Sequence, residues 1–177
     1  MAEQERLVDY WKTHKEVRFE EFGGKPGRII SARLLAGSDL LQGIVEVAKR
    51  YRLREGAIQV AFGSLGKAVI RWEELNPEGK RGTRRSAPKT LEGPVTLLCG
   101  QGKVGVPLEG DPVIHMHGVV SDTKGQVWGS HFFPEENPVF STLEVVIQEI
   151  QGVEFVLMHD PQTDSQLLRA RRIDPEF

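Results

Sequence analysis

The 177-residue chain contains a single cysteine, Cys99, so it cannot form an internal disulfide bond. We expect Cys99 to be a reduced thiol packed in a strand of a cytoplasmic protein. The sequence has no apolar run of the ~18–20 residues that a membrane helix needs. Residues 1–6 are acidic and lack the apolar core of a secretory signal. These absences favour a cytoplasmic location without a membrane partner.

Neither sign of charge dominates the composition. The chain has 23 Lys and Arg against 25 Asp and Glu, so a formal net charge of −2 gives no global attraction to nucleic acid. The length predicts one domain with its own core. We expect an N-terminal extension at residues 1–27 with a short helix over Glu3–His14, a main domain at 28–172, and a C-terminal tail at 173–177.

Short apolar segments rich in β-branched residues recur along the chain and predict strands. Residues 142–150 would also suit a helix, but their β-branched content favours a strand. One helix is expected before Gly56, because Ser38 or Asp39 can cap it, and Asp39 with Gln42 resembles a capping box. This pattern predicts an α+β fold, a mostly antiparallel sheet with one main helix packed on it. The expected strands are 28–35, 57–65, 67–72, 94–100, 113–121, 126–132, 142–150, 153–158 and 166–172.

Three of the five histidines, His115, His117 and His131, lie close together in the sequence. Residues two positions apart on a strand, such as His115 and His117, point to the same face of the sheet. A three-residue hairpin loop, Thr123–Gly125, with glycine in the left-handed position would pair Asp122 with Gln126 and set His117 directly opposite His131. Three imidazoles would then converge on one sheet face.

Three imidazole ligands with an open fourth position are the pattern of catalytic zinc. Imidazole also suits copper, iron and nickel. The alternative is that these histidines are ordinary polar residues on a solvated face.

Residues 76–92 have no apolar periodicity and predict a long loop. Its basic residues suit phosphate contact with nucleic acid or an anionic ligand. A solvated loop without a partner is the alternative, because no aromatic residues are interleaved for base stacking. The basic residues are Lys80, Arg81, Arg84, Arg85 and Lys89.

The order of motifs resembles the PPC (plants and prokaryotes conserved) domain family over residues 28–172. The resemblance rests on the helix opening Gly37-Ser38-Asp39, the segment Ala57–Leu65, the H-x-H…G-x-H pattern of residues 115–131, and Thr142-Leu143-Glu144-Val145 after it. It implies an α+β homotrimer, zinc on His115, His117 and His131, and a regulatory DNA-binding role. The chain has no AT-hook, the segment through which plant members contact DNA.

Two other functions fit the same residues. In a metal-dependent enzyme acting on a small molecule, the three histidines would hold the ion, and Glu144, or else Asp122, would serve as the base. Glu144 would otherwise be a structural hydrogen-bond acceptor. A cupin-like barrel is a third interpretation, but the tight loop before His131 argues against it.

Overall fold

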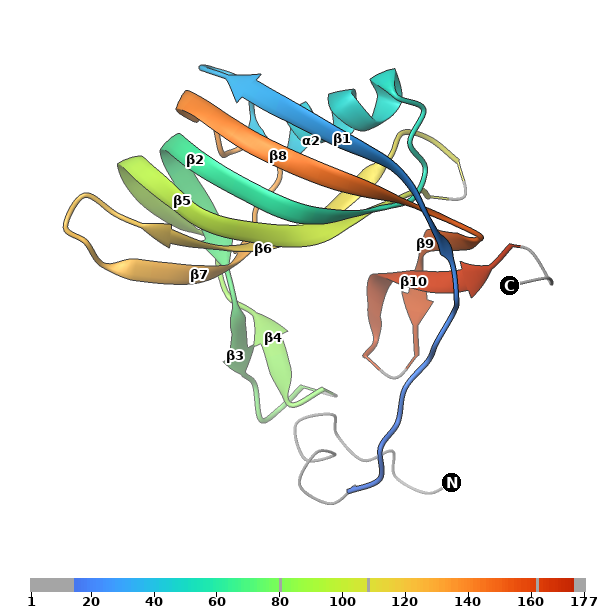
Figure 1. The fold of residues 1–177 in the computed structure, drawn as a ribbon. Coiled ribbons are helices and arrows are strands. Elements are labelled where there is room, and N and C mark those ends of the chain that lie inside the picture. The colour runs from blue at the N-terminus through green and yellow to red at the C-terminus, as the bar shows by residue number, and fades with distance from the viewer. Residues whose placement is uncertain (1–14, 80, 108, 162, 174–177) are drawn as a thin grey trace.

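The computed structural model describes residues 15–79, 81–107, 109–161 and 163–173 (Figure 1). The predicted α+β class is confirmed, because strands dominate this part of the chain, every ladder between strands is antiparallel, and a single short helix packs on the large sheet. The helix predicted over Glu3–His14 lies outside the described residues. No helix in the described ranges has the length and hydropathy needed to cross a membrane.

The large sheet has six strands in the order β1-β8-β2-β5-β6-β7. The end of β2 also pairs with β7, so β2, β5, β6 and β7 close on one another like part of a barrel. This closure brings residues that are distant in sequence, at the end of β2 and in β7, onto adjacent strands. The strands are β1 (Lys25–Leu35), β8 (Val139–Gln151), β2 (Gly56–Arg71), β5 (Lys89–Gly105), β6 (Val113–Ser121) and β7 (Val127–Phe132).

Two small hairpins extend from the large sheet. One pairs β3 (Glu73–Leu75) with β4 (Thr83–Arg85), and the other pairs β9 (Val153–Asp160) with β10 (Ser165–Arg172). Figure 1 shows both hairpins below the large sheet, on the same side of it in that view.

The helix α2 (Leu40–Arg50) begins as its sequence predicts. Asp39 is the N-cap, and its Oδ1 accepts hydrogen bonds from the backbone N–H of Leu41 (2.9 Å) and Gln42 (3.0 Å). The Gln42 side chain donates to Glu46 at 3.3 Å.

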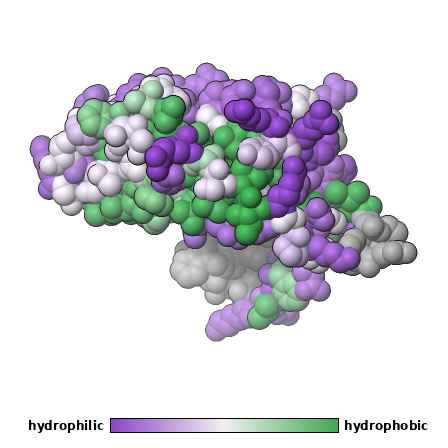
Figure 2. All heavy atoms as spheres, turned by 45° about the horizontal axis from the view of Figure 1, so that its top comes forward, coloured by the Kyte–Doolittle hydropathy of each residue, from purple (hydrophilic) through white to green (hydrophobic). Residues whose placement is uncertain are grey.

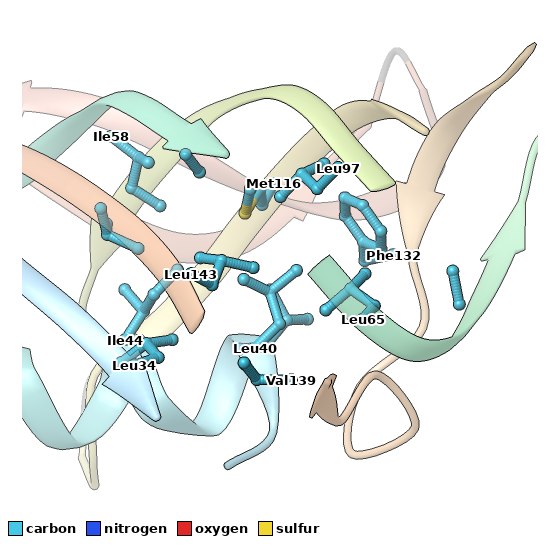
Figure 3. Close-up of a cluster of buried hydrophobic side chains, with 14 of the residues drawn as sticks. Leu34, Leu40, Ile44, Ile58, Leu65, Leu97, Met116, Phe132, Val139 and Leu143 are labelled. Carbon is cyan, nitrogen blue, oxygen red and sulfur yellow. The ribbon is translucent and has the colours of Figure 1, made fainter. Parts of the chain in front are cut away.

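The hydrophobic core lies between α2 and one face of the large sheet (Figure 3). Leu40 and Ile44 of α2 are fully buried, as are Met116 of β6, Phe132 of β7 and Leu143 of β8. Because side chains alternate along a strand, the neighbours of these core residues lie on the opposite face. We call this face, which points away from α2, the outer face.

The outer face carries exposed apolar side chains. We call Val60, Phe62, Leu98 and Phe140 the apolar patch; each is between 39% and 57% exposed. Phe62 and Leu98 line one shallow depression together. In the space-filling view, hydrophobic areas interrupt a surface that is otherwise largely hydrophilic (Figure 2).

The predicted loop over residues 76–92 is wrong in two places. Residues 83–85 form β4, and β5 already begins at Lys89. In the short hairpin, Glu73 lies opposite Arg85 and Glu74 opposite Arg84. Because this hairpin is made of opposite charges rather than alternating apolar residues, the hydrophobic pattern gives no sign of it.

The prediction that Cys99 is packed is also wrong, although the residue does lie in a strand. The register of β5 against β6 shifts between Leu97 and Cys99. This bulge interrupts the alternation, so Leu97 is buried while Leu98 and Cys99 are both exposed.

Candidate metal centre

The hairpin that carries the histidines forms around the predicted turn. The Asp122 N–H donates to the Gln126 carbonyl (2.9 Å), the Gly125 N–H donates to the Asp122 carbonyl (3.0 Å), and Gly125 has a φ of +75°. The Asp122 carboxylate accepts the Gln126 N–H (2.9 Å) and the Trp128 indole N–H (3.1 Å). Asp122 therefore stabilises the turn. It lies five residues along the chain from His117, roughly 16 Å away, which is too far for it to act as a base at the histidines.

The predicted register places the three histidines together. His117 lies directly opposite His131, and His115 lies two residues before His117 on the same strand. Met116, between the two, is fully buried in the core, which turns both imidazoles to the outer face.

The three imidazole rings face one another closely. The ring centroids are 5.0–5.4 Å apart, and the Nε2 atoms of His115 and His117 are 3.0 Å apart. One nitrogen from each ring lies within 4.8 Å of the other two. Tetrahedral zinc with bonds of about 2.0–2.1 Å sets its nitrogens about 3.3 Å apart, so small ring rotations would complete such a site.

The three histidines line a pocket of about 190 Å³. Arg71 lies directly opposite His131 across the β2–β7 ladder. Glu73 and Arg85 of the β3–β4 hairpin also line the pocket, as do Thr163 and Ser165 of the β9–β10 hairpin. Residues of both small hairpins therefore border the pocket, and the His117 side chain remains exposed.

Burial lowers the pKa of two of the imidazoles, which favours their neutral form. It is the main cause that lowers the pKa of His131 to about 4, with the other two histidines, Arg85 and Arg71 adding to the effect. Burial, then His117 and Arg85, also lowers the pKa of His115. A neutral imidazole offers a free lone pair, the form that binds a metal ion.

The metal-free protein should lose stability as the pH falls from about 6.5 to about 4. The unfolded chain takes up a proton on His131 near the ordinary value of 6.5, whereas the folded state resists it until its pKa of about 4. The stability is therefore complete above pH 6.5 and declines through this window. We expect the urea midpoint of chelator-treated protein to fall as the pH is lowered through this window. The fall should be smaller in the His131→Gln variant.

His159→Gln is the matched control for that slope, because His159 pairs with Asp164 outside the cluster. The pKa of Glu149 is lowered to about 2 by its hydrogen bonds with Arg28. The stability that Glu149 contributes is therefore lost as the pH falls from about 4.5 to about 2. If the urea midpoint of His131→Gln fell with pH as steeply as that of the unmodified protein, His131 would not be the cause of the decline.

The structure does not bring Glu144 to the histidines. Glu144 lies on β8, which β2 and β5 separate from β6, so roughly 14 Å of sheet intervenes. Its carboxylate pairs with Arg33. This geometry favours the structural role over the role of a base.

The predicted basic residues divide between two sides of the β3–β4 hairpin. Arg81 and Arg85 line the histidine pocket, whereas Arg84 pairs with Glu74 at 3.4 Å. Lys89 lies over the Trp128 ring at 4.5 Å, and Lys80 is outside the described residues. No motif marks Arg71 in the sequence, because its proximity to His131 depends on the pairing of β2 with β7.

Residues 21–151 of this chain match the model of the Plants and Prokaryotes Conserved (PCC) domain, the family called PPC above. The chain belongs to this family. The β9–β10 hairpin of this PPC protein lies beyond the matched residues.

Solved structures with the same fold include the metal-containing protein AF0104 from Archaeoglobus fulgidus, with a TM-score of 0.71 and 24% identity, covering 85% of this chain and 99% of that one. A plant- and prokaryote-conserved (PPC) protein from Pyrococcus horikoshii has a TM-score of 0.69 and 22% identity, over 85% and 98%. A Ralstonia eutropha JMP134 protein provisionally named as DNA-binding has a TM-score of 0.63 and 22% identity, over 78% and 89%.

The PPC protein also resembles the bifunctional protein GlmU of Synechococcus sp. strain JA-2-3B'a(2-13), with 29% identity over 136 residues. The match covers 77% of this chain and 19% of GlmU, so the chain spans about a fifth of the length of that relative.

Proposed function

We propose that this PPC protein acts as a homotrimer in which each subunit holds a zinc ion on His115, His117 and His131. The observation that carries the proposal is the convergence of three imidazole nitrogens within 4.8 Å in one pocket. The burial that lowers the pKa of His115 and His131 supports it, as does the similarity to a protein described as metal-containing. Zinc accepts three nitrogen ligands and keeps a fourth position open.

Metal analysis of the full chain tests the zinc centre. Protein purified without added metal and then dialysed with excess zinc should retain about one ion per chain, the ratio expected for one catalytic-type site. Cobalt in place of zinc should give the strong visible absorption of a four-coordinate ion. Protein that retains no metal after dialysis would contradict the proposal.

The apolar patch on the outer face supports the trimer. Val60, Phe62, Leu98 and Phe140 would all stay in contact with water in a single subunit. Contiguous exposed apolar side chains are typical of surfaces that bind another protein. We expect a solution mass of three times the chain mass of 19.8 kDa in light scattering.

DNA binding is a second candidate, favoured by the exposed Arg84 on the β3–β4 hairpin and by the provisional DNA-binding name of a structural neighbour. Three copies of the hairpin in a trimer would concentrate positive charge that one acidic chain lacks. We expect duplex DNA to be retained in a filter assay at low salt, and less of it with Arg84→Ala, because each lost phosphate contact weakens binding and reduces its salt dependence. No retention by the unmodified protein would exclude this candidate.

A metal-dependent enzyme acting on a small molecule is favoured by the pocket that the three histidines line. Zinc would supply an activated water at its open position, with a pKa lowered toward about 7. In this candidate Glu144 keeps its ion pair with Arg33, and the pocket residues, rather than Glu144, would contact the substrate.

A further inference from the structure

The histidine pocket carries an excess of positive charge. Three guanidinium groups, those of Arg71, Arg81 and Arg85, line it, and Glu73 supplies the only carboxylate among its described lining residues. Charged groups of one sign gathered in a concave site attract a ligand of the opposite sign.

The strand register explains why Arg71, Glu73 and Arg85 face the pocket. Arg71 lies opposite His131, Glu73 follows two residues later, and Arg85 lies opposite Glu73. Alternation turns Glu74 and Arg84 to the other side of the same hairpin. Within the β3–β4 hairpin, Arg85 therefore faces the histidines and Arg84 does not.

Arg81 has donor capacity that the described residues leave unused. Its Nε–H is buried without a hydrogen-bond partner among them, and its nearest Glu73 oxygen is 3.8 Å from a terminal nitrogen, beyond hydrogen-bond distance. A guanidinium presents its donors in a planar fork that matches the oxygens of a carboxylate or a phosphate.

We propose that this pocket binds a small anion, a carboxylate or a phosphate, through Arg71, Arg81 and Arg85, with one oxygen directed at the metal position on the three histidines. The proposal rests on the proposed metal centre. The pocket volume of about 190 Å³ suits a ligand of a few heavy atoms, since pockets for drug-sized ligands hold ~300–1,000 Å³. Thr163 and Ser165 also line the pocket, and their hydroxyls are hydrogen-bonded to each other at 2.9 Å.

Anion titrations of the cobalt-loaded full chain test the proposal, with inorganic phosphate and acetate as separate probes. Binding at the open position should change the visible absorption of the cobalt ion. We expect Arg85→Ala to raise the dissociation constant at least tenfold without changing the cobalt content, and Arg71→Lys to raise it as well. Arg84→Ala, on the other side of the hairpin, is the matched control and should leave it unchanged within about twofold.

The outcomes separate this proposal from the metal centre. If the chain holds cobalt but neither anion changes its spectrum at millimolar concentration, the anion site is overturned and the metal centre stands. If the chain takes up no metal, the metal centre fails. The anion site then stands if calorimetry on the metal-free protein shows phosphate binding that Arg85→Ala weakens, and it is overturned if no such binding is found. If duplex DNA displaces phosphate and Arg84→Ala weakens both, the pocket belongs to a nucleic-acid surface and the small-anion proposal is wrong.

Discussion

Replacing His117 with alanine should weaken zinc binding by at least ~100-fold, because even the loss of a partner that only orients a ligand costs about 10–100-fold. His117 links the cluster, since it lies opposite His131 and its Nε2 is 3.0 Å from that of His115. Two imidazoles would remain, fewer than the three protein ligands of a catalytic-type zinc site. Zinc content after dialysis and competition with a chromogenic chelator would measure the change.

The matched control for His117→Ala is His159→Ala. His159 is another exposed histidine on a strand, but its ring pairs with Asp164 at 3.1 Å, and it is not one of the pocket-lining residues. This variant should keep its zinc. If His117→Ala retained one zinc ion per chain, the three-histidine centre would be wrong.

Replacing Phe62 with aspartate should convert the proposed trimer to monomers. Phe62 is half exposed in the single subunit and lies in the middle strands of the outer face, within the apolar patch. Burying a carboxylate without a partner costs several kcal/mol, and a trimer would bury three of them. A change of at least ~100-fold in the dissociation constant, about 2.7 kcal/mol, should follow. Light scattering over a range of protein concentrations would measure it.

Leu75→Asp controls for the introduction of a charge. Leu75 is 75% exposed and lies on the β3–β4 hairpin, away from the apolar patch. This variant should keep the mass of the unmodified protein. A trimer that survives Phe62→Asp, with an unchanged dissociation constant, would show that the subunits meet through another surface.

Local chemistry allowed the histidine hairpin to be predicted from the sequence. A left-handed glycine at position 125 fixed the loop, the loop fixed the pairing of Asp122 with Gln126, and counting outward placed His117 opposite His131. The cap of α2 was equally local, since Asp39 needs only the next three residues to satisfy the first turn.

Features that depend on strand order could not be predicted in the same way. Glu144 follows the hairpin in sequence, but β8 lies between β1 and β2, on the far side of β5 from the histidines. Conversely, Arg71 meets His131 only because β2 is long enough to pair with β7 at its end. The exposure of Cys99 depends on a bulge, which alternation of apolar residues does not reveal.

All three proposed ligands belong to the β6–β7 hairpin, whose register is set by its own turn. A chain that has lost the rest of its tertiary structure could therefore still bring two or three imidazoles to one ion. Metal bound to the denatured ensemble reduces the shift in melting temperature that a given native affinity would produce. Thermal shifts with zinc should accordingly underestimate how tightly the native protein holds it.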